Sequence, residues 1–574
     1  PGSWFNAKQV EDAVTNLNEA AGNLGYAFAD INPAYDRDAE KRLMNITIKV
    51  GETPRVYVER IDITGNTSTR DKVIRREFRV NEGDAFNALK VKRSQDRIQS
   101  LGFFQDKFEI KQSEGSAPDR VVLTANVEEK PTGQLSLSGG YSSLERFLVQ
   151  LAVSQNNFMG KGQSLDAAVN YSRYSKSVEL GFTEPYFLDK PILLGGQLFR
   201  RDYNSFNFIG NQRNTTYSQT STGGALRTGF PLTEFMSFGG RYSLSRDKIA
   251  LDKNTFFTDP DLIPDPDGTG PLTGSNGPLP AVCDPLKAGR YLCDEIGKHT
   301  TSAVGYSLVF DSTDGVHPTR GRTWVASQDF AGLGGDVKYL RSVLSASQYK
   351  SIGGGWVFSV HGEGGYISPL GNKRHDTAGN EIEPIRLTDR FFGPQLRGFD
   401  IRGIGPRIQR VPYKCNNTTT CDAPTLDTTQ ARITDALGGR AYYMGRLELE
   451  FPISSTLRSL GLRPSAFVDA GSLWKLKPPQ LTDIPAQCFA TNSTTTPAVI
   501  NLSPGESCPA TGYTASPGFK ELYLGDSWKP RVSIGIGVNW TSPFGPLRID
   551  LAKALVKQEG DDTKLFSFNV GTSF

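Results

Sequence analysis

The sequence predicts a membrane all-β protein: a 16-stranded antiparallel transmembrane β-barrel over residues 131–574, preceded by small α+β modules in the order β-α-α-β-β. From Gly133 onward, segments of about ten residues alternate apolar with polar or small side chains, as where Leu447 and Leu449 flank Glu448. Short and long connections also follow one another along this region, which is typical of barrels with short turns on one side of a membrane. These two observations favour a membrane barrel over a soluble β-sandwich.

The composition excludes several other classes of protein. Hydrophobic residues make up 37% of the 574, mean hydropathy is −0.38, and no apolar run approaches the ~18–20 residues of a transmembrane helix. The 60 glycines and the 10% of aromatic residues are typical of β structure rather than of disorder. With 64 Lys and Arg against 61 Asp and Glu, the chain lacks a basic excess, and we expect no nucleic-acid partner.

The first 130 residues are expected to contain two successive modules. Residues 1–3 are expected to be a remnant of cloning, residues 4–52 the C-terminal part of one module, and residues 53–130 a complete module. The elements expected in the complete module are a strand at 56–63, helices at 69–78 and 85–101, and strands at 103–112 and 120–128. The partial module repeats the second half of that order, with a helix at 7–24 and strands at 26–31 and 43–50.

The barrel region is divided by connections of two lengths. Tight turns are expected at 157–162, 188–191, 231–234, 351–354 and 542–546. Long polar connections are expected at 251–298, 371–437 and 475–529, with shorter ones at 203–214 and 556–562. Aromatic residues at strand ends, among them Phe206, Phe391 and Trp540, are expected to form girdles at the two membrane interfaces.

The six cysteines form three local pairs, and every pair lies in one of the long polar connections. No C-x-x-C spacing occurs, which argues against zinc ribbons and thioredoxin-type redox sites. Local disulfides in an oxidising compartment are therefore expected, with reduced thiols as the alternative. The expected pairs are Cys283 with Cys293, Cys415 with Cys421, and Cys488 with Cys508.

Several short motifs resemble those of one known family. The segments that begin at Leu24 and Leu101, together with Thr64-Gly65-Asn66, resemble POTRA modules, the periplasmic domains of the Omp85 family. The segment Leu396-Arg397-Gly398-Phe399 resembles the (V/L)RGF motif of the same family, in the loop after the eleventh strand. The C-terminal strand, which ends in Phe574, is similar to the β-signal of outer-membrane proteins.

The resemblance implies that the motif-bearing loop folds back into the barrel and that its arginine contacts acidic residues of the inner wall. If Leu447 and Leu449 face lipid, Glu448 and Glu450 face the lumen, because strand side chains alternate. Asp469 resembles the other acidic position of the family. We expect Arg397 to pair with Glu450 and Asp469, with Glu450 preferred to Glu448 because it immediately precedes the Phe-Pro end of the strand.

The resemblance also implies a function: the central subunit of an assembly machinery that folds and inserts outer-membrane β-barrel proteins. The expected partners are accessory lipoproteins, contacted through Glu77, together with unfolded barrel clients and outer-membrane lipid. The modules would lie in the periplasm and the long loops outside the cell. An export pore of the same family, TamA-like or of the two-partner secretion kind, and a passive porin or receptor remain alternatives.

A lateral seam between the first and last strands is the expected route for clients. Glycine weakens strand pairing, and both strands contain glycine, so we expect this seam to open and to template a client strand. The seam residues are Gly133, Leu135, Leu137, Gly139, Gly140, Phe568, Val570, Gly571 and Phe574. We expect no enzyme activity, cofactor or metal, because no nucleophile, zinc-protease or phosphate-loop motif is present.

Overall fold

A computed structural model provides the structure of the chain, and the described residues cover both the modules and the barrel. These residues are 5–26, 31–38, 41, 43–51, 55–105, 108–142, 146–209, 212–258, 282–315, 318–371, 373–376, 379–415, 421–427, 433–454, 460–484, 487–490, 499–502, 513–516, 518–542 and 545–570.

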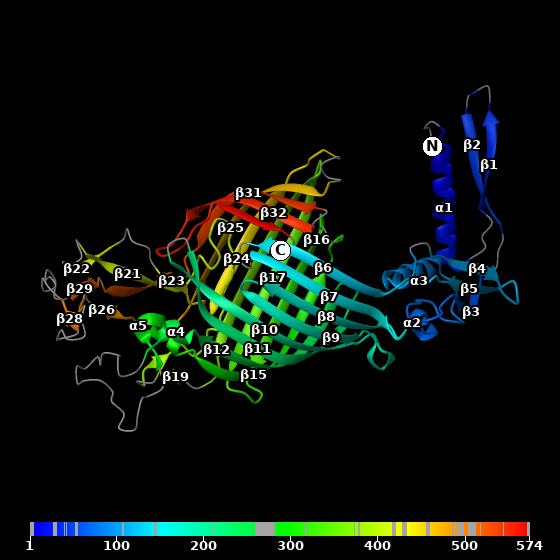
Figure 1. The fold of residues 1–574 in the computed structure, drawn as a ribbon. Coiled ribbons are helices and arrows are strands. Elements are labelled where there is room, and N and C mark those ends of the chain that lie inside the picture. Colours follow the sequence, from blue (N-terminus) through cyan, green and yellow to red (C-terminus); the bar gives the residue numbers. More distant parts are fainter. Residues whose placement is uncertain are drawn as a thin grey trace. The chain divides into compact units, whose positions relative to one another are not determined.

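The chain divides into two compact units. One comprises residues 1–135 with the short segments 153–166 and 182–185, and the other comprises residues 136–152, 167–181 and 186–574. The first unit contains the modules and the second contains most of the barrel (Figure 1). Among the described residues, no helix is long and apolar enough to cross a membrane.

The N-terminal module is represented by one helix and one strand pair. Helix α1 (Ala7–Asn23) begins after Asn6, whose side chain accepts hydrogen bonds from the backbone N–H groups of Lys8 and Gln9. Strands β1 (Ile31–Asp38) and β2 (Leu43–Val50) then pair antiparallel as a two-stranded sheet.

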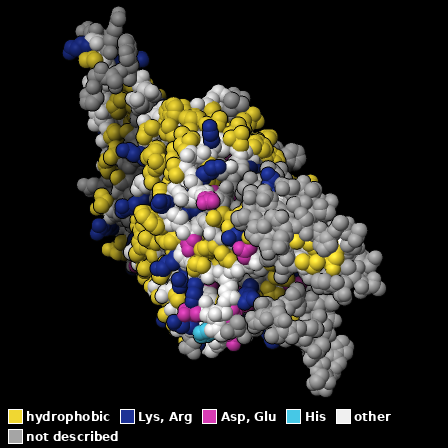
Figure 2. All heavy atoms as spheres, turned by 90° about the vertical axis from the view of Figure 1, so that its left-hand side faces the viewer, with side chains coloured by type: hydrophobic (Ala, Val, Ile, Leu, Met, Phe, Trp, Pro, Cys, Tyr) yellow, Lys and Arg dark blue, Asp and Glu magenta, His cyan; other side chains and the backbone are white. Residues whose placement is uncertain are grey.

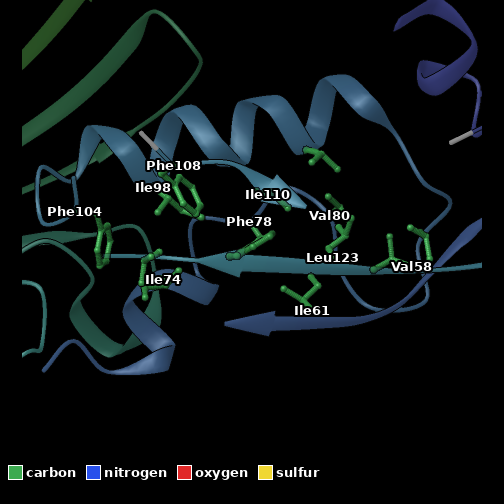
Figure 3. Packing of buried hydrophobic residues seen from close by; sticks show 14 of the residues in the cluster. Val58, Ile61, Ile74, Phe78, Val80, Ile98, Phe104, Phe108, Ile110 and Leu123 are labelled. Carbon is green, nitrogen blue, oxygen red and sulfur yellow. The ribbon is translucent and has the colours of Figure 1, made fainter. Parts of the chain in front are cut away.

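The second module has the expected order β-α-α-β-β. Its elements are β3 (Tyr57–Thr64), α2 (Asp71–Arg75), α3 (Ala88–Ser100), β4 (Ile110–Glu114) and β5 (Arg120–Asn126). The sheet order is β3-β5-β4, with β3 parallel to β5 and β4 antiparallel to it. Apolar side chains of the helices, including Ile74 and Ile98, pack on Ile61 and Leu123 of the sheet (Figure 3). This core holds the module together because removal of apolar side chains from water is favourable.

Sixteen strands form the wall of a closed antiparallel barrel, which confirms the predicted fold class (Figure 1). The wall strands are β6 (Gly133–Ser142), β7 (Arg146–Phe158), β8 (Gln163–Ser172), β9 (Ser175–Glu184), β10 (Leu193–Ile209), β11 (Gln212–Pro231), β12 (Met236–Leu251), β15 (Gly297–Asp311), β16 (Gly321–Ala331), β17 (Tyr339–Gly353), β18 (Trp356–Pro369), β24 (Ala441–Glu450), β25 (Leu462–Trp474), β31 (Arg531–Ser542), β32 (Gly545–Val556) and β33 (Phe566–Val570).

Five strands of the long connections extend the barrel sheet, and others form small sheets of their own. The extending strands are β21 (Arg407–Cys415), β22 (Cys421–Leu426), β23 (Ile433–Ala436), β26 (Asp483–Ile484) and β30 (Phe519–Leu524). The remaining elements are η1 (Phe187–Asp189), α4 (Lys253–Phe256), β13 (Phe257–Thr258), β14 (Val282–Cys283), α5 (Pro285–Ala288), α6 (Arg290–Cys293), β19 (Arg374–His375), β20 (Glu381–Ile382), β27 (Gln487–Ala490), β28 (Val499–Asn501) and β29 (Tyr513–Ser516).

Two expectations about the wall need correction. The connection expected at 203–214 is mostly strand, because β10 and β11 stay paired from Leu193 with Gly229 to Ile209 with Gln212. Phe206 and Phe391 are buried rather than placed in an outer girdle. The Phe206 ring centroid lies 5.1 Å from that of Tyr174, and the Phe391 centroid 4.7 Å from that of Tyr442.

The disulfides are partly visible in the described residues. Cys283 and Cys293 form a disulfide with a Cα–Cα distance of 5.7 Å. Cys415 and Cys421 are register partners on β21 and β22, and their bond stays a prediction. Cys488 is buried and disulfide-bonded. Its expected partner, Cys508, lies outside the described residues, so that pairing also stays a prediction.

Candidate functional site

The motif Leu396-Arg397-Gly398-Phe399 lies in the connection that follows β18, the eleventh wall strand. Leu396, Phe399 and Ile404 of this connection are buried together, and Met444 and Ala554 pack against them. This apolar cluster holds the connection against wall strands β24 and β32. We call residues 393–406 the latch loop.

Arg397 is the polar centre of the latch loop. Its Nε and Nη2 donate to Oδ2 and Oδ1 of Asp469 at 2.8 and 2.6 Å, and its Nη1 donates to Oε2 of Glu448 at 2.9 Å. The guanidinium carbon lies 3.3 Å from the ring centroid of Phe467. Arg397 is 8% exposed and Asp469 is fully buried. Because removal of either partner would leave a buried unpaired charge, this contact fastens the latch loop.

The structure corrects the expected choice of glutamate, because Arg397 pairs with Glu448 and not with Glu450. The residue opposite Asp469 on β24 is Arg446, and Glu448 is the next residue on that strand with its side chain toward the lumen. Glu450 shares this face but lies two residues, about 7 Å, further along the strand. Alternation identifies the lumen-facing residues, and the reach of the arginine selects between them.

Two wall arginines complete the charge cluster around Arg397. Arg446 Nε donates to Asp469 at 3.1 Å, and Arg548 Nε donates to Asp550 at 3.0 Å. A nitrogen of Arg548 also lies 3.6 Å from a carboxylate oxygen of Glu448. The cluster therefore balances three cations with three carboxylates. Sequence reasoning missed these arginines, although strand alternation places Arg446 on the same face as Glu448.

The latch loop also bonds, through its backbone, to the connection between β32 and β33. The N–H of Asp400 donates to the carbonyl of Asp562 at 3.0 Å, and the N–H of Asp562 donates to the carbonyl of Gly403 at 2.8 Å. The N–H of Lys564 donates to the carbonyl of Gly398 at 3.1 Å. These bonds join the latch loop to the segment that leads directly into the last strand.

Two further arginines tie the end of the latch loop to its surroundings, and the sequence motif contains neither. Arg407 is buried and donates from Nη1 to Asp562 at 2.5 Å and from Nη2 to the carbonyl of Arg402 at 2.7 Å. Arg402 donates to the hydroxyls of Tyr203 and Ser205 on β10 at 2.5 and 3.1 Å. The latch loop therefore contacts opposite parts of the barrel wall.

The first and last wall strands, β6 and β33, meet at the seam of the barrel. In the described part of the chain, β33 pairs with β6 only at Val570 and Tyr141. The pairing of β33 with β32 extends over five residue pairs, from Leu547 with Val570 to Leu551 with Phe566. Among the predicted seam residues, Leu135 and Leu137 are exposed, and Gly571 and Phe574 lie outside the described residues.

Glu77, the expected contact for a lipoprotein, is buried rather than presented to solvent. Its side chain is 4% exposed, and its carboxylate accepts a hydrogen bond from Arg97 Nη2 at 2.6 Å. Arg76 lies beside it, with Nε 3.9 Å from the carboxylate. A partner that binds Glu77 must therefore compete with Arg97 or approach the pair from its exposed arginine side.

The fold and the latch define an outer-membrane β-barrel protein with a loop fastened inside the barrel and modules before it. The Omp85 superfamily domain matches residues 157–574, and the POTRA model, described as a surface antigen variable number repeat, matches residues 1–53 and 56–130. The chain belongs to the Omp85 superfamily, which is not a family of enzymes.

Two curated relatives of the chain are named as outer membrane protein assembly factors. The chain is 29% identical to the outer membrane protein assembly factor BamA of Neorickettsia risticii (strain Illinois), over 100% of this chain and 62% of the relative. It is 25% identical to BamA of Neisseria meningitidis serogroup B, over 100% of this chain and 64% of the relative. The chain thus spans somewhat less than two thirds of these relatives.

A solved structure shares the fold over the whole chain. BamA from Haemophilus ducreyi lacking POTRA domains 1–3 superposes with a TM-score of 0.66 at 23% sequence identity. The match covers 100% of this chain and 95% of that one.

Proposed function

We propose that this chain is the barrel and the adjoining POTRA modules of the central subunit of a β-barrel assembly machinery. It folds and inserts outer-membrane β-barrel proteins through the seam between β6 and β33, without nucleotide hydrolysis. The observation that carries this proposal is the latch loop, which Arg397 fastens to Asp469 and which hydrogen-bonds to the segment that leads into β33.

When β33 separates from β6, the two strand edges leave backbone N–H and C=O groups available to another strand. An incoming client strand can satisfy those groups by β-augmentation, in which main-chain hydrogen bonds supply the affinity. The free energy for insertion then comes from folding of the client, because burial of apolar side chains in the bilayer is favourable. A nucleotide is not required for any of these steps.

Membership of the Omp85 superfamily supports the proposed partners and orientation. The short turns and the modules lie on the periplasmic side, and the long connections with their disulfides lie outside the cell. BamD-like and other accessory lipoproteins bind the modules, with Glu77 and its neighbour Arg97 as the contact. The clients are unfolded outer-membrane proteins, and the surrounding lipid is that of the outer membrane.

Locking the seam tests the proposal. Tyr141→Cys with Val570→Cys places two cysteines on the one registered pair of the seam. In lipid vesicles that contain the protein, oxidation should abolish the gain of protease-resistant client barrel, and reduction should restore it. A locked protein that assembles clients at the normal rate would contradict the proposal.

Ile549→Cys with Phe568→Cys is the matched control, because this pair joins β32 and β33 away from the seam. Its oxidation should leave client assembly unchanged. An export pore is distinguished by the client: if the locked seam stops transport of a soluble chain into the vesicles but not barrel assembly, the protein is an exporter. A porin would show neither effect.

A further inference from the structure

A cationic pocket lies at the end of the barrel that carries the long connections. It has a volume of about 300 Å³ and lies between the β16–β17 connection and the segments that follow β18. Four basic side chains and one carboxylate line it: Lys338, Lys373, Arg374, Arg386 and Asp336. Figure 2 faces this end of the barrel and shows Lys and Arg side chains at the edge of the apolar surface.

The ion pairs around the pocket leave an excess of positive charge. Lys373 pairs with Glu381 and Arg374 pairs with Glu295, each at 3.0 Å. Lys338 and Arg386 have no ion pair among the described residues. The carboxylate in the lining, that of Asp336, accepts a hydrogen bond from the backbone N–H of Thr300 at 2.8 Å. Two cations and one already engaged carboxylate thus remain, which favours an anionic ligand.

Apolar side chains are exposed directly beside this pocket. Phe330 at the end of β16, Leu333 in the β16–β17 connection and Leu370 after β18 are 41%, 52% and 49% exposed. They continue the apolar outer face of the wall, where Leu344 of β17 is also exposed. A free anion gains nothing from such neighbours, whereas an amphiphile covers them with its hydrocarbon chains.

Lys338 joins the charged and the apolar parts. A Cβ built on Gly332 would lie 3.5 Å from Lys338 Cγ, and one built on Gly371 would lie 3.3 Å from Lys338 Cβ. The lysine stem therefore passes between two glycine backbones, and the carbonyl of Lys338 accepts a hydrogen bond from Leu370 N–H at 3.2 Å. A lysine stem along an apolar edge with its ammonium at a polar pocket is the arrangement found at membrane interfaces.

We propose that this pocket binds the phosphate group of a membrane lipid, whose hydrocarbon chains cover Phe330, Leu333 and Leu370. Lys338 and Arg386 supply the charge-assisted hydrogen bonds to the phosphate oxygens. The bound lipid covers the apolar edge beside the β16–β17 connection. This site is independent of the seam and of client assembly.

Native mass spectrometry of the purified chain in detergent tests the proposal. Phosphatidic acid should bind at least about tenfold more tightly than diacylglycerol with the same acyl chains, because only the former has a phosphate. Lys338→Gln with Arg386→Gln should lower phosphatidic acid binding by about tenfold or more, at roughly 1 kcal/mol for each basic residue near a membrane surface. Equal binding of the two lipids, or no effect of the double substitution, would overturn the proposal.

Two controls separate the possible ligands and guard against misfolding. Lys350→Gln, at the other end of β17, should leave phosphatidic acid binding unchanged. Leu333→Asn with Leu370→Asn should weaken the binding of phosphatidic acid without affecting the binding of inorganic phosphate. If inorganic phosphate binds to the wild-type protein as tightly as the lipid does, the site is one for free phosphate and the proposal is wrong. If the variant with Lys338→Gln and Arg386→Gln loses the fast gel mobility of a folded barrel, the salt dependence of phosphatidic acid binding to the wild-type protein tests the proposal instead. Binding that does not weaken as the salt concentration rises contradicts the proposal. Client assembly should be normal in every folded variant.

Discussion

At the scale of single residues, the latch depends on close approach as much as on charge. Arg397 reaches Asp469 and Glu448 because the backbone beside it runs against the wall strands. Gly398 makes that approach possible: its φ is +87°, and a Cβ there would lie 3.0 Å from Cβ of Ser533 and 3.4 Å from Cβ of Ala552. The glycine and the arginine of the motif therefore serve one contact.

Gly398→Ala should lower the stability of the barrel by about 1–2 kcal/mol, because alanine is strained at positive φ and meets the wall. The urea concentration at which the purified barrel loses its fast gel mobility measures this effect. Gly445→Ala on β24 is the control, because a Cβ at residue 445 would meet none of the described atoms within 4 Å. This substitution should change the free energy of unfolding by less than about 0.5 kcal/mol. Equal midpoints for the two variants would show that Gly398 is not a required glycine.

At the scale of elements, the latch loop and the β32–β33 connection form one bonded unit. Three backbone hydrogen bonds join them, and Arg407, the residue directly after the latch loop, adds an ion pair with Asp562. The same connection leads into β33, the last strand of the seam. Movement of β33 away from β6 would therefore be expected to strain the latch.

Arg397→Ala should raise the rate of amide hydrogen exchange at Asp562 and Lys564 by about tenfold or more. Loss of the buried ion pair frees the latch loop, whose carbonyl groups accept hydrogen bonds from these two amides. Hydrogen exchange with mass spectrometry measures the change on peptides from 557–565. Arg446→Ala, which removes a wall contact to the same Asp469, should leave these amides protected. Unchanged exchange in Arg397→Ala would separate the latch from the last strand.

The second module contains a pH-sensitive turn outside the membrane-spanning strands. Burial alone would raise the pKa of Glu129, but hydrogen bonds from Thr69, Thr67 and Ser68 outweigh it and lower the pKa to about 2. The carboxylate accepts from Thr67 Oγ1 at 2.7 Å, Ser68 N at 2.9 Å and Thr69 N at 2.6 Å. Because the pKa of Glu129 is lower in the folded state, the stability that these hydrogen bonds contribute is complete above pH about 5. That stability is lost as the pH falls toward 2.

Glu129→Gln should lower the melting temperature of the helical far-ultraviolet signal at neutral pH. The free energy of unfolding of the module should fall by about 1 kcal/mol. The difference from wild type should shrink as the pH falls from 5 toward 2, since wild-type Glu129 then becomes protonated as well. Glu128→Gln, at the exposed neighbouring residue, is the control and should behave as wild type. A difference that persists unchanged to the lowest pH would refute the assignment.

At the scale of the whole molecule, the barrel closes where its last wall strand, β33, pairs with its first, β6. Neighbouring wall strands such as β11 and β12 pair over fifteen residues, from Tyr217 with Leu251 to Pro231 with Ser237. The described residues register the seam at Tyr141 and Val570, and the residues after Val570 lie outside them. The cysteine lock between Tyr141 and Val570 tests the seam at this scale.

The barrel, the modules and the motif could all be predicted from the amino-acid sequence alone. Alternation with period two is a local property, so the lumen-facing sides of β24 and β25 could be assigned without a structure, and the modules were visible as helical spacing between short strands. The resemblance of Leu396-Arg397-Gly398-Phe399 to a family motif located the latch.

The pairing of particular side chains, in contrast, depends on how distant segments of the chain pack together. Glu448 and Glu450 share one face, and the position of Arg397 beside Asp469 selects Glu448. The sequence indicates that Glu77 is a charged residue at the end of a helix. The packing of α3 buries its side chain against Arg97. The bonds from the latch loop to the β32–β33 connection join residues more than 150 positions apart. Such contacts depend on how loops fold into the lumen, and strand periodicity contains no information about that.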